Sequence, residues 1–291
     1  MHSSASNNTF EVRLLSGVLG AEISGLDLSQ PLRPAIIDEL RAAFVEHAVL
    51  VFRDQDLTAE QQVAFGRCFG VLDTHPFVDG RPDQPEVIDI VTEPDDRFNF
   101  GGGWHTDVTF LERPDLGSIL SAVELPRAGG DTLFADQRAA YDALSSTMKG
   151  IIDGLTAHHS AIRQYGTGGQ STRSSAIGTK NPDAAARRVE HPVVCVHPET
   201  GRRALYVNRA FTIDIVGMSP AESQALLEFL FQHGVSERFT CRVRWEPGSI
   251  AMWDNRSVQH YALHDYAGHA RRMRRITIQG DRPTAPAPTQ R

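Results

Sequence analysis

Short strand-like segments that do not alternate regularly with helices constrain the fold of this chain more than any other feature of its sequence. They recur after residue 117, and turn formers such as HPETGR and EPGS separate them. The segments are SILSAVEL (118–125), HPVVCVH (191–197), RALYV (203–207), TCRVRW (240–245), IAMW (250–253) and RRITI (274–278). This arrangement argues against a doubly wound α/β fold. An antiparallel sandwich or jelly roll with helices packed outside fits the pattern better.

Three other segments carry helical signals. In 34–47 a proline opens a run whose apolar side chains recur at helical spacing. Capping boxes at Thr58–Gln61 and Ser219–Glu222 predict helices that end near Phe69 and Gly234.

Length and composition exclude several classes of protein. The chain has 291 residues, of which 41% are apolar and 22% charged, so it is neither disordered, fibrous nor a disulfide scaffold. We expect disordered tails at 1–9 and 284–291, because both are polar or of low complexity. The segment 165–190 is long, polar and glycine-rich, which makes it a candidate lid; the alternative is a surface insertion without a role.

The charge balance limits the possible partners. A net charge of −7 argues against a nucleic-acid ligand, so a local arginine cluster must carry any anion recognition. No apolar run approaches the roughly 18–20 residues that cross a bilayer, and the N-terminus lacks a secretory signal. We therefore expect a cytoplasmic protein without a membrane partner. Cys68, Cys195 and Cys241 are widely spaced and fit reduced core cysteines.

A His-x-Asp pair is the first candidate for chemistry. If the segment is a strand, His105 and Asp107 point to the same face. The pair alone is weak evidence, since it arises by chance in many chains of this length. His260, which follows the strand SIAMW and the segment WDNRSVQ, is a plausible third ligand. Two histidines and one carboxylate leave three coordination positions open, which suits non-haem Fe(II) better than zinc.

The run RRMRRITI is the second candidate. On a strand, Arg271, Met273 and Arg275 share one face, while Arg272 and Arg274 share the other. Two inward arginines are costly unless anions bind them, and their forks match carboxylates or sulfonates. The alternative is a solvated edge strand protected by charge.

Several segments match a known family in order and spacing, from about residue 12 to about residue 283. They are GVLGAEISGLDLSQPL, WHTDVTF, GGDTLF, HPETGRRALYVN and WDNRSVQHYALHDYAGHARRMRRITIQGDRP. The chain resembles the taurine dioxygenase family of Fe(II)/2-oxoglutarate-dependent oxygenases, which includes the phenoxyalkanoate-degrading dioxygenases. The resemblance implies one domain over 1–283, mainly β with flanking helices and a double-stranded β-helix (jelly-roll) core. It also implies a homodimer or homotetramer.

The same resemblance suggests roles for individual residues. His105, Asp107 and His260 correspond to the iron ligands. Arg271 corresponds to the partner of the distal carboxylate of 2-oxoglutarate, and Thr132 to the hydroxyl that binds the same cosubstrate.

On the substrate side, Arg275 resembles the family arginine that holds the anionic head of the primary substrate. His75, Val108, Phe110 and Phe211 fall where the family lines its substrate pocket, although each of them alone would more often be a core residue.

The implied reaction uses Fe(II), 2-oxoglutarate and O2, and it releases succinate and CO2. A carbon next to a heteroatom is hydroxylated in a small organic anion: a sulfonate, a sulfate ester or an aryloxyalkanoate. Taurine-specific members carry a tyrosine and an asparagine where this chain has Val78 and Gly101. Because those two polar contacts are lost, we favour a bulkier, more apolar anion over taurine.

Four other functions fit the sequence less well. Taurine dioxygenase activity proper is the nearest alternative, and a non-catalytic jelly-roll protein that binds small anions is a distant one. A zinc hydrolase lacks an evident general base and leaves the arginine pair unexplained. A halogenase is disfavoured because Asp107 retains the carboxylate that would have to be absent to make room for halide.

Overall fold

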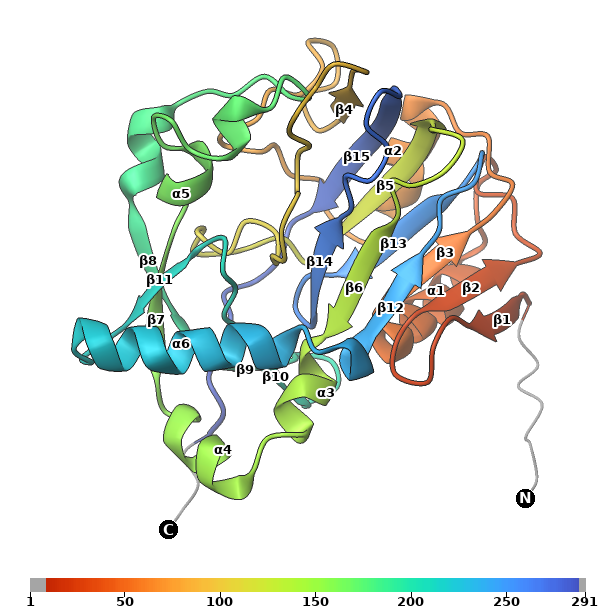
Figure 1. Cartoon of the computed structure of the whole chain (residues 1–291). Helices are drawn as coiled ribbons and strands as arrows, with labels where there is room; N and C mark the ends of the chain where they lie inside the picture. Colours follow the sequence, from red (N-terminus) through yellow and green to blue (C-terminus); the bar gives the residue numbers. More distant parts are fainter. Residues whose placement is uncertain (1–8, 288–291) are drawn as a thin grey trace, which may run out of the picture.

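A computed structural model describes residues 9–287 and shows two facing β-sheets with helices outside them (Figure 1). In the larger sheet, β13 pairs antiparallel with β3 and β5, and β15 pairs antiparallel with β5 and β4. From edge to edge its strands are β1 (Glu11–Leu14), β2 (Ala21–Ser24), β3 (Val49–Phe52), β13 (Ile250–Asp254), β5 (Gly117–Glu124), β15 (Arg271–Ile278) and β4 (Ile88–Thr92).

The smaller sheet lies across the first and has the order β12 (Thr240–Val243), β6 (Thr132–Asp136), β14 (Val258–Ala262) (Figure 1). Apolar side chains from both sheets, among them Phe134, Trp253 and Met273, form one core cluster between them. The prediction of a mainly β fold with a jelly-roll core is confirmed. The two sheets stay separate and do not close into a barrel within residues 9–287.

Two helices cover the outer face of the larger sheet. They are α1 (Pro34–His47) and α2 (Ala59–Arg67), and a second core cluster lies beneath them. The predicted capping box of α2 is present, since Thr58 accepts from the Gln61 amide and Gln61 caps Thr58 in return. The helix ends two residues before the predicted Phe69.

A third group of elements packs against the open end of the sandwich. Its strands are β7 (Thr156–Ser160), β8 (Arg188–Pro192), β11 (Thr212–Ile215) and the hairpin β9 (Val194–Val196) with β10 (Arg203–Leu205). Its helices are α3 (Gln137–Asp142), α4 (Ser146–Ile152) and α6 (Pro220–Gly234). The predicted capping box of α6 and its end at Gly234 are both confirmed.

The segment 165–190 is not structureless. It begins at the end of α5 (Ile162–Tyr165) and contains the short 3-10 helices η1 (Ser171–Arg173) and η2 (Pro182–Ala186). It also buries Ala176 and Ala185 against the rest of the chain. Its closure as a lid stays a prediction.

Tails are predicted at 1–9 and 284–291, and residues 1–8 and 288–291 of them lie outside the described residues. Within 284–287, the Thr284 carbonyl accepts a hydrogen bond from the Val196 amide at 2.9 Å, and Pro286 is buried. No helix between residues 9 and 287 has the length and apolar character that crossing a membrane requires.

Candidate active site

Three buried side chains converge between the sheets at the place where the sequence predicts a metal site. His105, Asp107 and His260 each present a ligand atom within 4.8 Å of the others. The Nε2 atoms of His105 and His260 lie 3.6 Å and 3.8 Å from Oδ1 of Asp107. The donor set is two imidazoles and one carboxylate, all facing a common point.

The backbone holds two of these residues directly against each other. His260 lies in β14, and His105 forms an isolated bridge with it: the His105 amide donates to the His260 carbonyl at 3.0 Å, and the His260 amide donates back at 2.8 Å. The segment is not a strand beyond this bridge, so strand alternation is not what brings His105 and Asp107 to the same place. The chain leaves the bridge at once and enters a turn in which Val108 has a φ of 44°.

The two imidazoles are in the protonation state that a metal requires. His105 Nδ1 lies 2.7 Å from the Gly103 carbonyl, which can only accept, so Nδ1 carries the proton and Nε2 keeps its lone pair. Burial lowers the pKa of His105 and, more strongly, that of His260. Both rings are therefore neutral at pH 7 and free to coordinate.

Asp107 is held as an anion. Burial raises the pKa of its carboxyl, but the positive charge of Arg275, the adjacent His260 and His105 and the hydrogen bond from Ser118 favour the anion, and the net pKa is lowered. Its Oδ2 accepts from Ser118 Oγ and faces Arg275 Nη2, both at 2.9 Å. Oδ1 is thus left to face the imidazoles, and this set of donors fits a divalent cation.

The arginine run occupies β15 with the two faces predicted from its alternation. Arg271 and Arg275 are 6% and 4% exposed, whereas Arg272 is exposed on the other face. Arg271 Nε and Nη2 are buried and find no partner among residues 9–287. A buried guanidinium with unused donors is costly, which favours an anion at this position.

Thr132 and Trp245 surround the Arg271 site. The Trp245 indole nitrogen donates to Thr132 Oγ1 at 3.0 Å. The Arg271 guanidinium carbon lies 5.9 Å from the ring centres of both Trp245 and Tyr266. Gly130 has a φ of 71°, and a Cβ there would come within 3.0 Å of Arg271 Nε. The Arg271 guanidinium is therefore closely surrounded.

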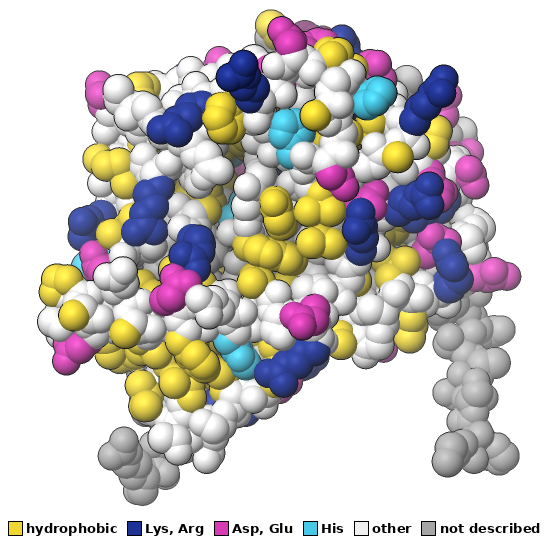
Figure 2. Space-filling model, viewed as in Figure 1, with side chains coloured by type: hydrophobic (Ala, Val, Ile, Leu, Met, Phe, Trp, Pro, Cys, Tyr) yellow, Lys and Arg dark blue, Asp and Glu magenta, His cyan; other side chains and the backbone are white. Residues whose placement is uncertain are grey.

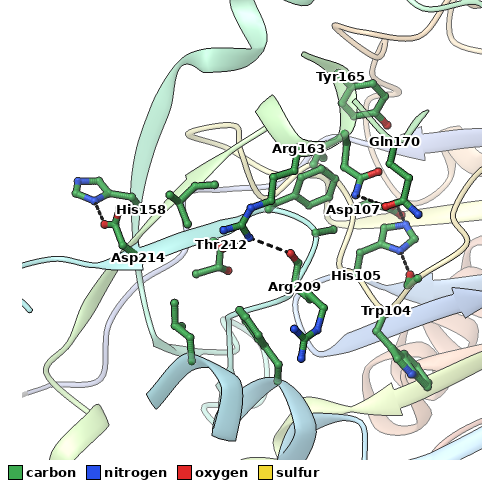
Figure 3. A pocket seen from close by; sticks show the side chains of 18 of the residues that line it. Trp104, His105, Asp107, His158, Arg163, Tyr165, Gln170, Arg209, Thr212 and Asp214 are labelled. Carbon is green, nitrogen blue, oxygen red and sulfur yellow. Dashed lines mark hydrogen bonds and ion pairs between the residues drawn. The ribbon is translucent and has the colours of Figure 1, made fainter. Parts of the chain in front are cut away.

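A cavity of about 950 Å³ opens beside the triad and extends between β11 and α6 (Figure 3). Figure 2 shows hydrophobic side chains gathered at the centre of this face with basic side chains around them. His75, Val108 and Phe211 line this cavity, and their part in substrate binding stays a prediction. At its outer part Arg163 donates to the carbonyls of Arg209 and Thr212.

Phe110 and Val78 are not among the residues that line this cavity. Phe110 packs behind it, with its ring centre 5.0 Å from that of Phe211 and 5.3 Å from that of Phe77. Val78 is buried in the core. Gly101 does line the cavity, so of the two departures from taurine-specific members only this one borders the site.

Tyr165 is a lining residue that the sequence analysis missed. Its ring stacks on Phe77 at 5.3 Å, and its hydroxyl lies 3.5 Å from His75 Nε2. His75 Nδ1 accepts from the Phe77 amide, so its proton is on Nε2. Burial lowers the pKa of His75 to about 3, with a further contribution from Arg275. The available signal was an aromatic residue just after HSAIRQ, at the start of the glycine-rich segment.

Comparison with known proteins decides the family. A family model described as "Taurine catabolism dioxygenase TauD, TfdA family" matches residues 11–277. The chain belongs to this family. Members are α-ketoglutarate (2-oxoglutarate)-dependent dioxygenases, and so is this chain; the family implies 2-oxoglutarate and iron.

Three relatives show how close the similarity is. An α-ketoglutarate-dependent sulfate ester dioxygenase of Pseudomonas putida is 37% identical over 276 residues, covering 94% of this chain and 90% of that protein. An alkylsulfatase of Acinetobacter baylyi is 36% identical over 274 residues, covering 93% and 85%. The crystal structure of a taurine dioxygenase from Burkholderia xenovorans superposes with a TM-score of 0.80 at 38% identity, covering 96% and 93%.

Proposed function

We propose that this TauD/TfdA-family enzyme hydroxylates a carbon next to a heteroatom in a small anionic organic substrate, with Fe(II), 2-oxoglutarate and O2, and releases succinate and CO2. The main support is the pair of buried arginines on β15. The strand β15 presents two buried guanidiniums on one face, of which Arg275 touches the metal triad and Arg271 has unused donors. A metal site with one anion site beside it and a second on the same face of the strand suits such a reaction.

In this proposal His105, Asp107 and His260 hold the iron, which when bound supplies the activation of O2. Arg271 and Thr132 bind the distal carboxylate of 2-oxoglutarate. The support is that Nε and Nη2 of Arg271 have no partner among the described residues, and that Gly130 leaves room for this guanidinium where a Cβ would crowd it. A carboxylate there would receive charge-assisted hydrogen bonds from groups that otherwise have none.

Arg275 orients the primary substrate. Its Nη2 contacts Asp107, while its buried Nε has no partner among the described residues. An anion bound there would lie beside the metal ligands, so the carbon next to the anionic group faces the metal. Val108 and Phe211 supply apolar walls that exclude water from this carbon.

The cavity favours a substrate with an apolar body. Its volume of about 950 Å³ exceeds the needs of an aminoethyl group, and pockets of about 300–1,000 Å³ suit much larger ligands. Phe211, Met218, Leu227 and Phe231 line it, and Gly101 offers no side chain for an ammonium. Among the predicted classes we therefore favour alkyl sulfate esters. Hydroxylation of the carbon that bears the ester oxygen gives a product that collapses to an aldehyde and sulfate.

We further propose a single domain over 1–283, a cytoplasmic location and a homodimer or homotetramer. Three free cysteines support a reducing compartment. We propose the segment 165–190 as the lid, since its residues Gln170 and Ser171 line the cavity.

The test is an anaerobic titration with Fe(II) and 2-oxoglutarate, followed by O2 and a panel of taurine, alkyl sulfonates, alkyl sulfates and aryloxyalkanoates. Succinate is the readout. We expect alkyl sulfates to raise succinate most strongly, His105→Ala to abolish it, and Arg275→Ala to remove the stimulation by substrate. No succinate with any panel member would contradict the proposal, and a strong preference for taurine would overturn the substrate class.

A further inference from the structure

Buried hydrogen bonds join the turn that carries Asp107 to the wall of the cavity, through side chains that belong to neither the metal triad nor the anion sites. Thr109 lies two residues after Asp107. Its hydroxyl is 3.1 Å from Asn208 Nδ2 and 3.0 Å from His159 Nδ1. Asn208 Oδ1 in turn accepts from the Phe211 amide at 3.0 Å. Thr109 and Asn208 are each 1% exposed, and His159 is 0% exposed.

The backbone of Phe211 fixes the orientation of the Asn208 amide. The Phe211 N–H can only donate, which fixes the Asn208 carbonyl oxygen toward Phe211 and the amide nitrogen toward Thr109. Thr109 Oγ1 accepts from that nitrogen and is also hydrogen-bonded to His159 Nδ1. Burial lowers the pKa of His159, so the ring that binds Thr109 is neutral. The Thr109 hydroxyl is thus held from two sides by buried partners.

The turn needs such support because of Val108. A β-branched residue with a φ of 44° is in the left-handed region, which valine disfavours. Val108 sits between the metal-site residue Asp107 and the anchored Thr109, and its side chain lines the cavity. If Thr109 were released, the turn could relax toward an ordinary conformation and shift both the Asp107 carboxylate and the Val108 wall.

We infer that Thr109 and Asn208 are positioning residues that fix the metal-binding turn and the Phe211 wall relative to each other. This inference rests on the proposed function. Asn208 connects the two parts, because its side-chain amide binds Thr109 of the turn through nitrogen and Phe211 of the cavity wall through oxygen. The consequence concerns the coupling of two reactions, the oxidation of 2-oxoglutarate and the hydroxylation of the substrate. When the substrate carbon is held at the metal, each oxidation of 2-oxoglutarate is followed by one hydroxylation.

The experiment compares Thr109→Val, which keeps the shape and removes the hydroxyl, with Thr109→Ser, which keeps the hydroxyl. The affinity for Mn(II) is measured by calorimetry on the metal-free protein, without turnover. Coupling is measured as the ratio of succinate to sulfate formed from hexyl sulfate. We expect Thr109→Val to weaken Mn(II) binding about 10-fold, as outer partners of metal ligands do, and to raise the ratio above one. Thr109→Ser should restore both quantities.

Ser249→Ala is the matched control, because it removes a buried hydroxyl that binds Arg53 and does not line the cavity. It should change stability but neither Mn(II) affinity nor coupling. Asn208→Ala removes the same bond from the other side and also frees Phe211, so it should raise the KM for hexyl sulfate as well. If Thr109→Val does not fold, the same two measurements on Asn208→Ala test the inference.

Two results would overturn the inference. One is that Thr109→Val and Asn208→Ala keep the parent Mn(II) affinity and a ratio of one. The other is that neither variant folds, which would assign these residues to stability alone. Failure of the proposed function is a separate result: the unsubstituted protein would form no succinate, while the Mn(II) affinities would still report on Thr109.

Discussion

The indole nitrogen of Trp245 donates a hydrogen bond to the hydroxyl oxygen of Thr132 at 3.0 Å. This bond occupies an acceptor position of the hydroxyl and directs its hydrogen elsewhere. The same indole ring lies 5.9 Å from the guanidinium carbon of Arg271. Trp245 therefore supports both groups that we assign to the distal carboxylate of 2-oxoglutarate, without needing to touch the carboxylate itself.

Replacing Trp245 by Phe should weaken 2-oxoglutarate binding about fivefold, since a hydrogen bond of about 1 kcal/mol that orients Thr132 is lost while a ring stays near Arg271. Calorimetry on the Mn(II)-loaded protein measures the affinity. 2-Oxopentanoate, which lacks the distal carboxylate, is the matched ligand and should bind equally well to both proteins. Equal losses for the two ligands would show that Trp245 acts only on the shape of the pocket.

Arg271→Gln should separate binding from stability. Loss of a charge-assisted pair should weaken 2-oxoglutarate binding about 100-fold. The ligand-free protein should be as stable as the parent or more stable, because the substitution removes a buried charge whose Nε and Nη2 have no partner among residues 9–287. Thermal melts with and without 2-oxoglutarate test both points. Arg272→Gln, on the exposed face, is the control; a destabilised ligand-free Arg271→Gln protein would contradict the argument.

His75 should make the stability of the metal-free protein depend on pH. Its pKa is lowered by burial to about 3 in the folded protein and is about 6.5 when unfolded. Between these values the unfolded chain binds a proton that the folded chain does not. The contribution of His75 is therefore complete above pH 6.5 and is lost as pH falls toward 3.

Urea unfolding in the presence of a chelator, at pH 7 and pH 5, measures this effect. The loss of unfolding free energy on acidification should be about 2 kcal/mol smaller in His75→Gln than in the parent. His269→Gln, a substitution of an exposed histidine, should leave the difference unchanged. An identical pH dependence in His75→Gln and the parent would show that His75 is protonated in the folded protein.

Ala210 offers a way to shorten the cavity. It lines the cavity next to Phe211. Ala210→Phe should lower kcat/KM for decyl sulfate relative to ethyl sulfate by about tenfold, because displaced methylene contacts are worth roughly that much discrimination. Ala210→Ser, which barely changes the volume, should keep the parent ratio. If the ratio stayed constant in Ala210→Phe, the alkyl chain would have to take another path.

Local signals in the sequence predicted the elements that depend on local physics. The helices α2 and α6 begin at capping boxes that the sequence shows directly, since their bonds join residues three apart. The two faces of β15 follow from simple alternation. The family resemblance then assigned chemistry to these positions, and the structure brings His105, Asp107 and His260 together.

Where the sequence analysis failed, distant contacts overrode local preference. Val108 is β-branched and favours a strand. Its turn is nevertheless held by hydrogen bonds that join the neighbouring Thr109 to Asn208 and His159, and no local sequence pattern reveals these bonds. Tyr165 was read as part of a polar segment because its ring partners, His75 and Phe77, come from far along the chain. Asn208 lies inside a matched motif, but its role depends on where Thr109 and Phe211 meet.

The strand β15 sets the distance between Arg271 and Arg275. Arg271 and Arg275 are four residues apart on one face, and at about 3.3 Å per residue their Cα atoms are separated by about 13 Å. The whole span is paired with β4, and from Arg272 onward it is also paired with β5, with a register shift between Arg272 and Met273. Attempts to change the substrate range of the enzyme should therefore leave the spacing between Arg271 and Arg275 unchanged. The adjustable parts are β11 and α6, which line the cavity, because changes there would fit a new substrate tail without moving the two arginines to which we assign 2-oxoglutarate and the substrate anion.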